Sequence, residues 1–395
     1  MSAPGRTASL ALLLVAEIGA MSLWFVSAAI LPELTAEAAL APWRAALLSS
    51  AVQIGFVAGA LTLAVHGTAD RYDPRRVFAL SAALAGAATV LFVIAPIGGW
   101  AQVGLRAATG FCLAGVYPVG MKIAVGWTVR RRGLVVGLLV AALTLGSAAP
   151  HGLALIGGPD WRVTAGIAAS LSLFSAALIL LSRLGPHHAT APRFDPAALK
   201  LAWRIRGVRL AIAGYLCHMW ELYAYWAWIA VALAASFQAA GAEDPLTLAR
   251  LGAFAAIALG GLACAPAGAL ADRFGKARIA GVCLAVGALS AGACAASFGG
   301  PPALTLTLAI LWGIFVIPDS AQFSALVADA APAERAGSLM TFQTALGFLL
   351  TAGTIQAAPM AAAAFGWPVT LALFGLGPLL GVEAMRRLHA LRRLG

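Results

Sequence analysis

The sequence predicts an all-α polytopic membrane protein with about twelve transmembrane helices in two pseudo-symmetric six-helix bundles. Its 395 residues are 62 % hydrophobic and only 10 % charged, whereas a soluble domain carries roughly 25 % charged residues. The apolar runs reach the length of about 20 residues that a helix needs to cross a bilayer. They lack the period-two alternation of a transmembrane barrel, which leaves helices as the spanning structure.

An imperfect internal repeat divides the chain into halves. HGTADRYDPRR occupies residues 66–76, and GALADRFGKAR occupies residues 268–278. Aligning Asp70 with Asp272 gives an offset of 202 residues, close to half of the chain. Because each copy lies between two apolar runs, the repeat indicates a duplicated membrane bundle.

Twelve apolar runs are expected to span the membrane. They lie near residues 8–31, 43–65, 77–97, 101–126, 133–156, 163–183, 208–236, 248–267, 279–298, 303–328, 337–357 and 368–385. The first run is longer than the core of a signal peptide and lacks a strongly basic start. We therefore expect it to remain in the protein as a span.

A proline-rich segment interrupts the apolar pattern near the middle of the chain. We expect an N-terminal bundle over residues 1–185, a cytoplasmic linker over 186–206 and a C-terminal bundle over 207–395. Residues 196–209 have the spacing of a short amphipathic helix that lies on the membrane surface.

Basic residues are distributed unevenly among the expected loops. With the N-terminus inside, 21 of the 26 lysines and arginines fall in cytoplasmic segments. This bias follows the positive-inside rule and predicts that both termini are cytoplasmic. It also accounts for the formal net charge of +11 without a nucleic-acid partner, because the charge is scattered over separate loops.

The cysteines and histidines form no recognisable metal or cofactor motif. All five cysteines fall inside expected spans, with neither a C-x-x-C pair nor a zinc-ligand spacing. His187 and His188 are best interpreted as part of a solvated linker. The sequence also has no Walker loop, dinucleotide-binding fingerprint or nucleophile elbow. We expect no metal, no cofactor and no enzyme activity.

Ionisable residues inside membrane spans are costly and usually functional. The expected proton-coupling residues are Glu221, Glu17, Arg106 and Asp319. Glu221 is the strongest candidate because it lies near the middle of its span, beside His218 and among aromatic residues. A carboxylate there can load and release a proton. The alternative is a permanently neutral or arginine-paired glutamate that only holds helices together.

Helical spacing places further polar and aromatic residues on the same faces as these charges. The expected substrate-cavity residues are Met21, Trp24, Tyr117, His218, Tyr225, Trp228, Trp312 and Gln322. Arg106 is expected to face an anion or a carboxylate. Asp319 and Lys122 are expected to form a salt bridge between the halves, with snorkelling to lipid headgroups as the alternative for Lys122.

The repeated loop resembles the signature of the major facilitator superfamily of secondary transporters, G-x-L-x-D-R-x-G-R/K-x-R/K. The second copy matches at Gly268, Leu270, Asp272, Arg273, Gly275, Lys276 and Arg278. The first copy keeps Asp70, Arg71 and Arg76, with Arg75 beside the last, but has His66 and Asp73 in place of glycine. An R-x-x-x-G pattern from Arg106 to Gly110 is similar to one that the family links to proton coupling.

The resemblance covers essentially the whole chain and implies a transporter of bacterial type, working as a monomer in the cytoplasmic membrane. It implies that the first, fourth, seventh and tenth helices surround a central cavity. It also implies that the loops act as gates through the residues Asp70, Arg71, Arg75, Gly268, Asp272, Arg273, Gly275 and Lys276. Glycines there would allow close helix approach, and the ion pairs would form in one conformation and break in another. Anchoring to headgroup phosphates is the alternative role for these loops.

These observations predict a proton-coupled secondary transporter of a small organic molecule that works by alternating access. The aromatic residues favour export of a drug or metabolite, and the expected partners are a small-molecule substrate, a coupling proton and the bilayer. Import of carboxylates or sugars is the alternative within the same class. A non-transporting receptor or assembly factor of the same fold is the alternative from another class, and a membrane enzyme is a weaker third.

Overall fold

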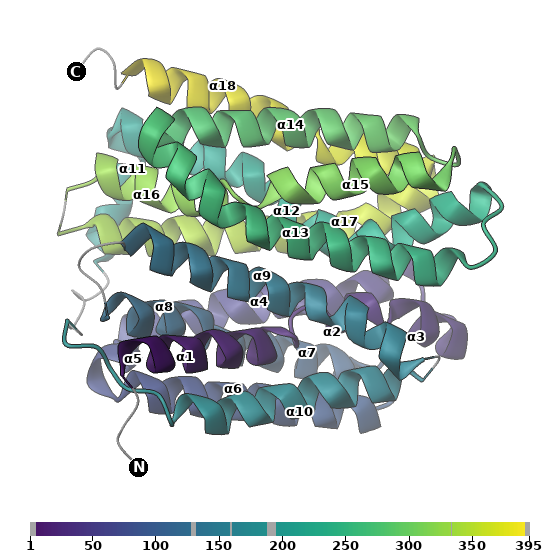
Figure 1. Ribbon diagram of the computed structural model, residues 1–395, viewed down its shortest axis with the longest axis horizontal. Coiled ribbons are helices and arrows are strands. Elements are labelled where there is room, and N and C mark those ends of the chain that lie inside the picture. The colour runs from purple at the N-terminus through teal and green to yellow at the C-terminus, as the bar shows by residue number, and fades with distance from the viewer. Residues whose placement is uncertain (1–4, 128–131, 159, 188–194, 333, 392–395) are drawn as a thin grey trace. The chain divides into compact units, whose positions relative to one another are not determined.

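The computed structural model describes residues 5–127, 132–158, 160–187, 195–332 and 334–391, which form helices and no strand (Figure 1). Ten stretches of these residues are long and apolar enough to cross a membrane. Two local features lower the count from the expected twelve. The first expected span is broken into short helices, and the last two run together as one apolar stretch, Ala336–Leu391. The predicted all-helical membrane fold is confirmed.

The chain divides into two compact units, Met1–Ala191 and Pro192–Gly395. The helices of the first unit are α1 (Arg6–Met21), α2 (Val26–Ala29), α3 (Leu31–Ala38), α4 (Pro42–His66), α5 (Thr68–Arg71), α6 (Pro74–Ile94), α7 (Trp100–Leu113), α8 (Tyr117–Val125), α9 (Arg132–Gly157) and α10 (Trp161–Ile179). Within this unit α4 runs along α7, α6 along α10, and α1 along both α9 and α10.

The second unit begins with short linker elements and continues as long helices. They are η1 (Pro196–Ala198), α11 (Leu199–Arg204), α12 (Arg206–Ala239), α13 (Pro245–Phe274), α14 (Lys276–Ala296), α15 (Pro302–Val316), α16 (Ser320–Ala330), α17 (Ala336–Phe374) and α18 (Leu376–Leu391). Figure 1 shows α14 beside α18, in agreement with their extensive contact. α12 packs against α13, α17 and α18, so it forms the centre of this unit.

The expected linker helix is shorter than predicted. The helix expected over residues 196–209 is split, because α11 ends at Arg204 and the long α12 begins two residues later. α11 packs against α12 and α17, with Ala202 buried and Trp203 exposed. The last part of the expected linker therefore folds with the second unit, while its residues 188–194 lie outside the described part of the chain.

The first expected span is not one continuous helix. α1 ends at Met21, and a turn over residues 22–25 separates it from α2. The carbonyls of Leu23 and Trp24 lie in this turn, and the Arg106 Nη2 of α7 donates to both, at 2.9 and 2.8 Å. Broken backbone at membrane depth needs such a partner. Arg106 therefore compensates for the break in the first span.

The fourth and tenth expected spans are each interrupted near a proline. α7 and α8 are separated by residues 114–116, just before Pro118, and α15 and α16 are separated by residues 317–319, which include Pro318. Proline lacks a backbone N–H and clashes with the preceding helical turn, so both interruptions have a local cause. The second interruption places Asp319 at the N-cap of α16.

The eleventh expected span and the start of the twelfth lie in one helix, α17, which contains a non-helical residue at Gly366 with φ 82°, while the rest of the twelfth lies in α18. That backbone conformation is readily accessible to glycine. Pro368 follows and cannot donate to the preceding turn. The predicted boundary between the eleventh and twelfth spans is thus a kink at residue 366 rather than a loop.

Two helix pairs cross closely, one in each unit. In the first, Cβ atoms built on Gly55 and Gly110 would overlap the carbonyl oxygens of Ala107 and Val52, where α4 meets α7. In the second, a Cβ on Gly313 would overlap the carbonyl oxygen of Ala256, where α13 meets α15. Small residues allow such crossings in membranes, where dispersion contacts drive helix association.

Candidate proton-coupling site

Glu221 lies in the middle of α12, inside the second unit. Its side chain is buried, and Trp312 on α15 donates its indole N–H to Glu221 Oε2 at 3.0 Å. The other carboxylate oxygen faces α14, where a Cβ on Gly287 would lie only 2.7 Å away. Glu221 therefore points toward α14 and α15, and the glycine leaves room for its carboxylate.

His218 and Asp319 form a second buried pair one helical turn away. His218 Nδ1 lies 3.0 Å from Asp319 Oδ1, and the two side chains are 0 % and 2 % exposed. The rings of Tyr215 and Phe323 pack around the imidazole, with centroid distances of 6.1 and 5.4 Å. An imidazole and two carboxylates thus lie in one apolar bundle, which is an arrangement that can hold and pass protons.

The aromatic residues expected in the cavity are engaged inside the second unit. Tyr225 donates its hydroxyl to the Ala309 carbonyl at 2.6 Å, and its ring packs at a tilt against Trp312 with a centroid distance of 4.5 Å. Trp228 donates its indole N–H to the Ile355 carbonyl at 3.0 Å. Gln322 is buried in the first turn of α16. The polar groups of Tyr225 and Trp228 are thus satisfied, and both side chains are buried.

Glu17 of the first unit has a different environment. Its side chain is fully buried on α1, and neither carboxylate oxygen has a hydrogen-bond partner among the described residues. Glu17 Oε2 lies against α8, where a Cβ on Gly120 would be 2.6 Å away. Met21, one turn later, packs its Cβ against Gly146 of α9. The Glu17 carboxylate is therefore buried without a hydrogen-bond partner among the described residues.

The other first-unit residues expected in the cavity have different surroundings. Trp24 lies in the turn after α1, and its ring packs at a tilt against Phe56 of α4, with a centroid distance of 4.8 Å. Tyr117 is the first residue of α8 and is partly exposed.

Arg106 was expected to face an anion or a carboxylate, and in this structure backbone carbonyls take one of its nitrogens, while Nε and Nη1 have no hydrogen-bond partner among the described residues. Its Nη2 binds two backbone carbonyls of the broken first span, and its guanidinium lies 5.9 Å from the Phe92 ring. The sequence could not reveal these acceptors, because they exist only where the helix unwinds.

Asp319 and Lys122, expected to form a salt bridge between the halves, each have another partner within their own unit. Lys122 Nζ forms an ion pair with Asp70 and donates to the Ala69 carbonyl at 2.6 Å. Asp319 pairs with His218 instead. Each charge has a closer partner on a neighbouring helix of its own unit, which spacing along the chain does not show.

In both units, the repeated loop is joined by an ion pair to the helix that ends nearby. In the first unit, Asp70 of the loop pairs with Lys122 of α8. In the second, Lys276 of the loop pairs with Asp329 of α16, at 2.8 Å. The acid and the base have exchanged places between the two copies. Arg71, Asp272 and Arg273 are exposed.

The residues that differ from the loop signature have their own structural roles. Asp73 caps α6 by accepting from the Arg75 backbone N–H at 2.9 Å, and it pairs with the Arg75 side chain at 2.6 Å. The hydrogen bond from Arg75 lowers the pKa of Asp73. Arg75 also donates to the Ser182 carbonyl at 2.9 Å, which ties α6 to the end of α10.

The predicted close helix approach at Gly268 and Gly275 is wrong. A Cβ on either residue would have no atom within 4 Å. Gly275 instead has φ 96° at the turn between α13 and α14, a conformation that glycine adopts without strain.

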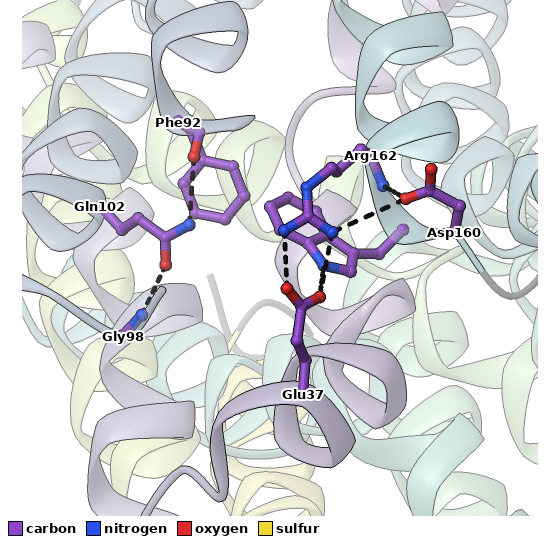
Figure 2. Close-up of polar contacts among 7 residues, drawn as sticks. Glu37, Phe92, Gly98, Gln102, Asp160 and Arg162 are labelled. Carbon is purple, nitrogen blue, oxygen red and sulfur yellow. Dashed lines mark hydrogen bonds and ion pairs between the residues drawn. The ribbon is translucent and has the colours of Figure 1, made fainter. Parts of the chain in front are cut away.

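A polar cluster at the opposite end of the first unit was missed by the sequence analysis (Figure 2). Glu37 on α3 accepts from Arg162 at 2.7 and 3.0 Å and from the Trp161 indole at 2.8 Å. These bonds lower the pKa of Glu37 to about 2. Figure 2 also shows Gln102 between the Phe92 carbonyl and the Gly98 N–H. The only signal in the sequence was opposite charge in two expected loops.

Comparisons with known proteins agree with this architecture. The sequence profile described as Major Facilitator Superfamily matches residues 12–355. A solved structure of a mutant nucleoside transporter, NupG, is similar with a TM-score of 0.73 at 14 % identity, covering 96 % of this chain and 99 % of that one. A D-xylose-proton symporter is similar with a TM-score of 0.72 at 16 % identity, covering 94 % and 96 %.

A comparison with curated protein sequences found no match. At 14 and 16 % identity, the similarity to these two structures shows the fold alone. The family profile matches residues 12–355, which is most of the chain, and therefore shows the family. The chain therefore belongs to the Major Facilitator Superfamily, a family of membrane transporters rather than enzymes.

Proposed function

We propose that this protein is a proton-coupled secondary transporter that exports a small organic solute, a drug or metabolite, by alternating access. The observation that carries the proposal is the buried cluster of Glu221, His218 and Asp319. Three ionisable groups in an apolar bundle are costly, and such groups in membrane proteins commonly mark proton pathways. The cluster lies on α12 and at the start of α16, which correspond to the seventh and tenth expected spans.

Glu221 is the proton carrier in this scheme. When it is protonated, the carboxyl group is neutral and suits its apolar surroundings. When it loses the proton, the Trp312 indole N–H stabilises the charge through the hydrogen bond to Oε2. His218 and Asp319 supply a second pair, within which a proton can move over 3.0 Å. Glu17 and Arg106 are the corresponding ionisable groups of the first unit.

The loop ion pairs supply the conformational latch. Asp70 with Lys122, and Lys276 with Asp329, each connect a loop to a neighbouring helix and are partly exposed to solvent. Pairs of this kind contribute little individually. They can therefore form and break as the two halves rock, without a large barrier.

The solute class follows from the ring faces on α12 and α15. Tyr225, Trp228 and Trp312 have donors that are already engaged, so they favour a flat or amphipathic solute through stacking. The D-xylose-proton symporter among the similar structures supports proton coupling in this fold and keeps import as the alternative direction. The proposed location is the bacterial cytoplasmic membrane, with both termini inside and the protein monomeric.

A proton-flux measurement tests this function. The full-length protein is reconstituted in proteoliposomes that contain a trapped pH-sensitive dye, and pools of aromatic drugs and metabolites are added outside. We expect at least one pool to cause a pH change with the wild type, and none to do so with Glu221→Gln. Glu383→Gln, at an exposed carboxylate of α18, is the matched control and should retain the flux. Proton flux that survives in Glu221→Gln would contradict the proposed coupling.

A further inference from the structure

Arg44, in the first turn of α4, lies over two tryptophan rings. Its guanidinium carbon is 4.5 Å from the ring centroid of Trp43 and 4.2 Å from that of Trp100, the first residue of α7. Arg44 forms no ion pair among the described residues, and its enclosed Nη1 has no hydrogen-bond partner there. The protein thus fixes this cation in place through ring faces and leaves its charge without a carboxylate.

A second arginine at the same end of the first unit shows what is missing. The Arg162 guanidinium also lies over a tryptophan ring, that of Trp161, at 4.5 Å. Unlike Arg44, it pairs with a carboxylate, that of Glu37, at 2.7 Å (Figure 2). One arginine has its counter-charge within the protein, and the counter-charge of the other has to come from outside.

The backbone turn before α7 holds Trp100 over Arg44. The Gln102 side chain accepts from the Gly98 N–H at 2.7 Å and donates to a carbonyl at the end of α6 (Figure 2). Gly98 has φ 66°, and a Cβ there would overlap the Leu40 side chain and lie 3.9 Å from Arg44 Cγ. The turn therefore packs against the start of α4, so the arrangement of rings and guanidinium is built into the fold.

The position of Arg44 along its helix places it at the level of the lipid headgroups. α4 has 25 residues and at 1.5 Å per residue is about 37 Å long, which exceeds the hydrocarbon core of about 30 Å. Trp43 and Trp100 are 44 % and 67 % exposed, and Ile94 at the end of α6 is exposed beside them in the chain. Tryptophans with this exposure at helix ends are typical of the membrane interface.

The chemistry of the guanidinium selects the ligand. Rings cover faces of the group, so the N–H groups at its edge remain for an acceptor, and the planar edge matches two oxygens of a phosphate. The missing counter-charge favours an anion and disfavours a cation. At the depth of the headgroups, the anionic acceptor that the bilayer itself supplies is the phosphate of a phospholipid.

We propose that Trp43, Arg44 and Trp100 form a binding site for the phosphate headgroup of a membrane phospholipid. The phosphate binds at the edge of the guanidinium, and the indole rings lie against the glycerol and the first part of the acyl chains. This site lies apart from the acidic cluster of the second unit and does not depend on the proposed transport. The bound lipid holds together the first turns of α4 and α7.

The first experiment separates the phosphate from the chains. Full-length protein in detergent, stripped of lipid, is titrated with dioleoylphosphatidylglycerol, with dioleoylglycerol, which lacks the phosphate, and with inorganic phosphate, which lacks the chains. A ligand that binds the folded state raises the unfolding midpoint. We expect the phospholipid to raise it well above the other two. Equal stabilisation by dioleoylglycerol or by inorganic phosphate would overturn the proposal, because chains alone or a free anion would then account for binding.

A pair of variants then assigns the site. Native mass spectrometry counts the molecules of dioleoylphosphatidylglycerol that remain on the protein at increasing lipid concentration. Arg44→Gln should lose one tightly bound lipid, with an affinity about tenfold lower, since a charge-assisted contact is removed. Arg162→Gln is the matched control, because it removes the same charge at the same end from an arginine that Glu37 already neutralises. An undiminished lipid count in Arg44→Gln, or an equal loss in both variants, would overturn the proposal.

A third variant keeps the charge and removes a ring. Trp100→Leu should weaken binding of the same lipid several-fold, because the guanidinium loses one of the two ring contacts that fix its orientation. The lipid count is read on folded protein, so a loss of stability in any variant does not obscure it. Wild-type lipid occupancy in Trp100→Leu would show that the rings are not part of the site and would overturn the proposed arrangement.

Discussion

The two units each bury a glutamate at a similar depth of their first long helix, but they satisfy it differently. Glu221 accepts a hydrogen bond from Trp312 and has the His218–Asp319 pair one turn away. Glu17 has no hydrogen-bond partner among the described residues. The two acids are not at equivalent positions of the repeat, because the offset of 202 residues aligns Glu17 with Met219 rather than with Glu221. One acid is hydrogen-bonded within its unit, and the other is buried without a hydrogen-bond partner among the described residues.

The repeated loops show the same kind of divergence. The acid comes from the loop in the first unit, as Asp70, and from the helix in the second, as Asp329. The attraction is unchanged by the exchange, because a Coulomb interaction depends on the product of the charges. The ion pair was retained while the residues that form it were not. This explains why a signature based on residue identity describes only part of the contact.

The largest expected effect concerns the helix crossings that hold each unit together. Gly110→Ala should destabilise the protein by about 3 kcal/mol or more, because its Cβ would overlap a backbone carbonyl that cannot rotate away. Gly104→Ala, on the same helix but with no atom within 4 Å of the new Cβ, is the control and should be neutral or slightly stabilising. Denaturation in mixed detergent measures both. Equal effects would show that α4 and α7 can separate freely.

The second-largest expected effect is the difference in stability between a variant of Asp319, which has a buried partner, and a variant of Glu17, which has no hydrogen-bond partner among the described residues. Asp319→Ala should cost about 3 kcal/mol, since it leaves His218 buried without its partner. Glu17→Gln should change stability by less than about 0.5 kcal/mol, because no internal bond is lost. Thermal unfolding without ligand measures the difference. A large loss in Glu17→Gln would mean that the carboxylate has a structural partner, which would end the contrast between the units.

The glycines opposite the two glutamates sharpen the contrast further. Gly287→Ala places a Cβ 2.7 Å from Glu221, whose carboxylate is held by Trp312, and should cost about 1–3 kcal/mol. Gly120→Ala places one 2.6 Å from Glu17, which can swing aside without breaking a hydrogen bond, so the cost should stay below about 1 kcal/mol. If Gly120→Ala lowered the unfolding midpoint more than Gly287→Ala, the surroundings described for Glu17 and Glu221 would be contradicted.

The exchanged ion pairs predict a smaller effect. Lys122→Asp alone should cost up to about 1 kcal/mol, because two carboxylates would then face each other, and Asp70→Lys in addition should restore most of the loss. The same swap of Lys276 and Asp329 should behave alike. A double-mutant cycle on the unfolding midpoint measures the coupling. Absence of rescue in either unit would show that the pair is not interchangeable.

The smallest effect is the acid dependence of the Glu37 cluster. Bonding to Arg162 and Trp161 lowers the pKa of Glu37 to about 2, from 4.5. A lowered folded-state pKa means that the contribution is complete above pH 4.5 and is lost as the pH falls toward 2. The difference in unfolding midpoint between wild type and Glu37→Gln should thus be constant from pH 8 to about pH 5 and shrink below it. A difference that grows on acidification would contradict the assignment.

Composition and run length determined the fold class, because a chain with so few charges can cover only a surface that faces lipid. The repeat likewise indicated a duplicated bundle, and polar residues inside apolar runs marked the buried acids. What could not be read from the sequence was which partner each charge takes. Lys122 and Arg106 both make contacts that were not predicted, since candidates on several helices were equally compatible with helical spacing.

The tertiary structure decided those partners for a physical reason. Arg106 binds carbonyls that become available only where the first span unwinds, and Lys122 reaches a loop carboxylate that folding brings beside α8. Hydrophobic periodicity is a one-dimensional property and survives in the sequence. Hydrogen-bond and ion-pair choice depends on distances of a few ångströms between segments far apart in the chain. The sequence thus determined a duplicated helical membrane protein with buried charges. Only packing decided that Glu221 accepts a hydrogen bond from Trp312 while Glu17 has no hydrogen-bond partner among the described residues.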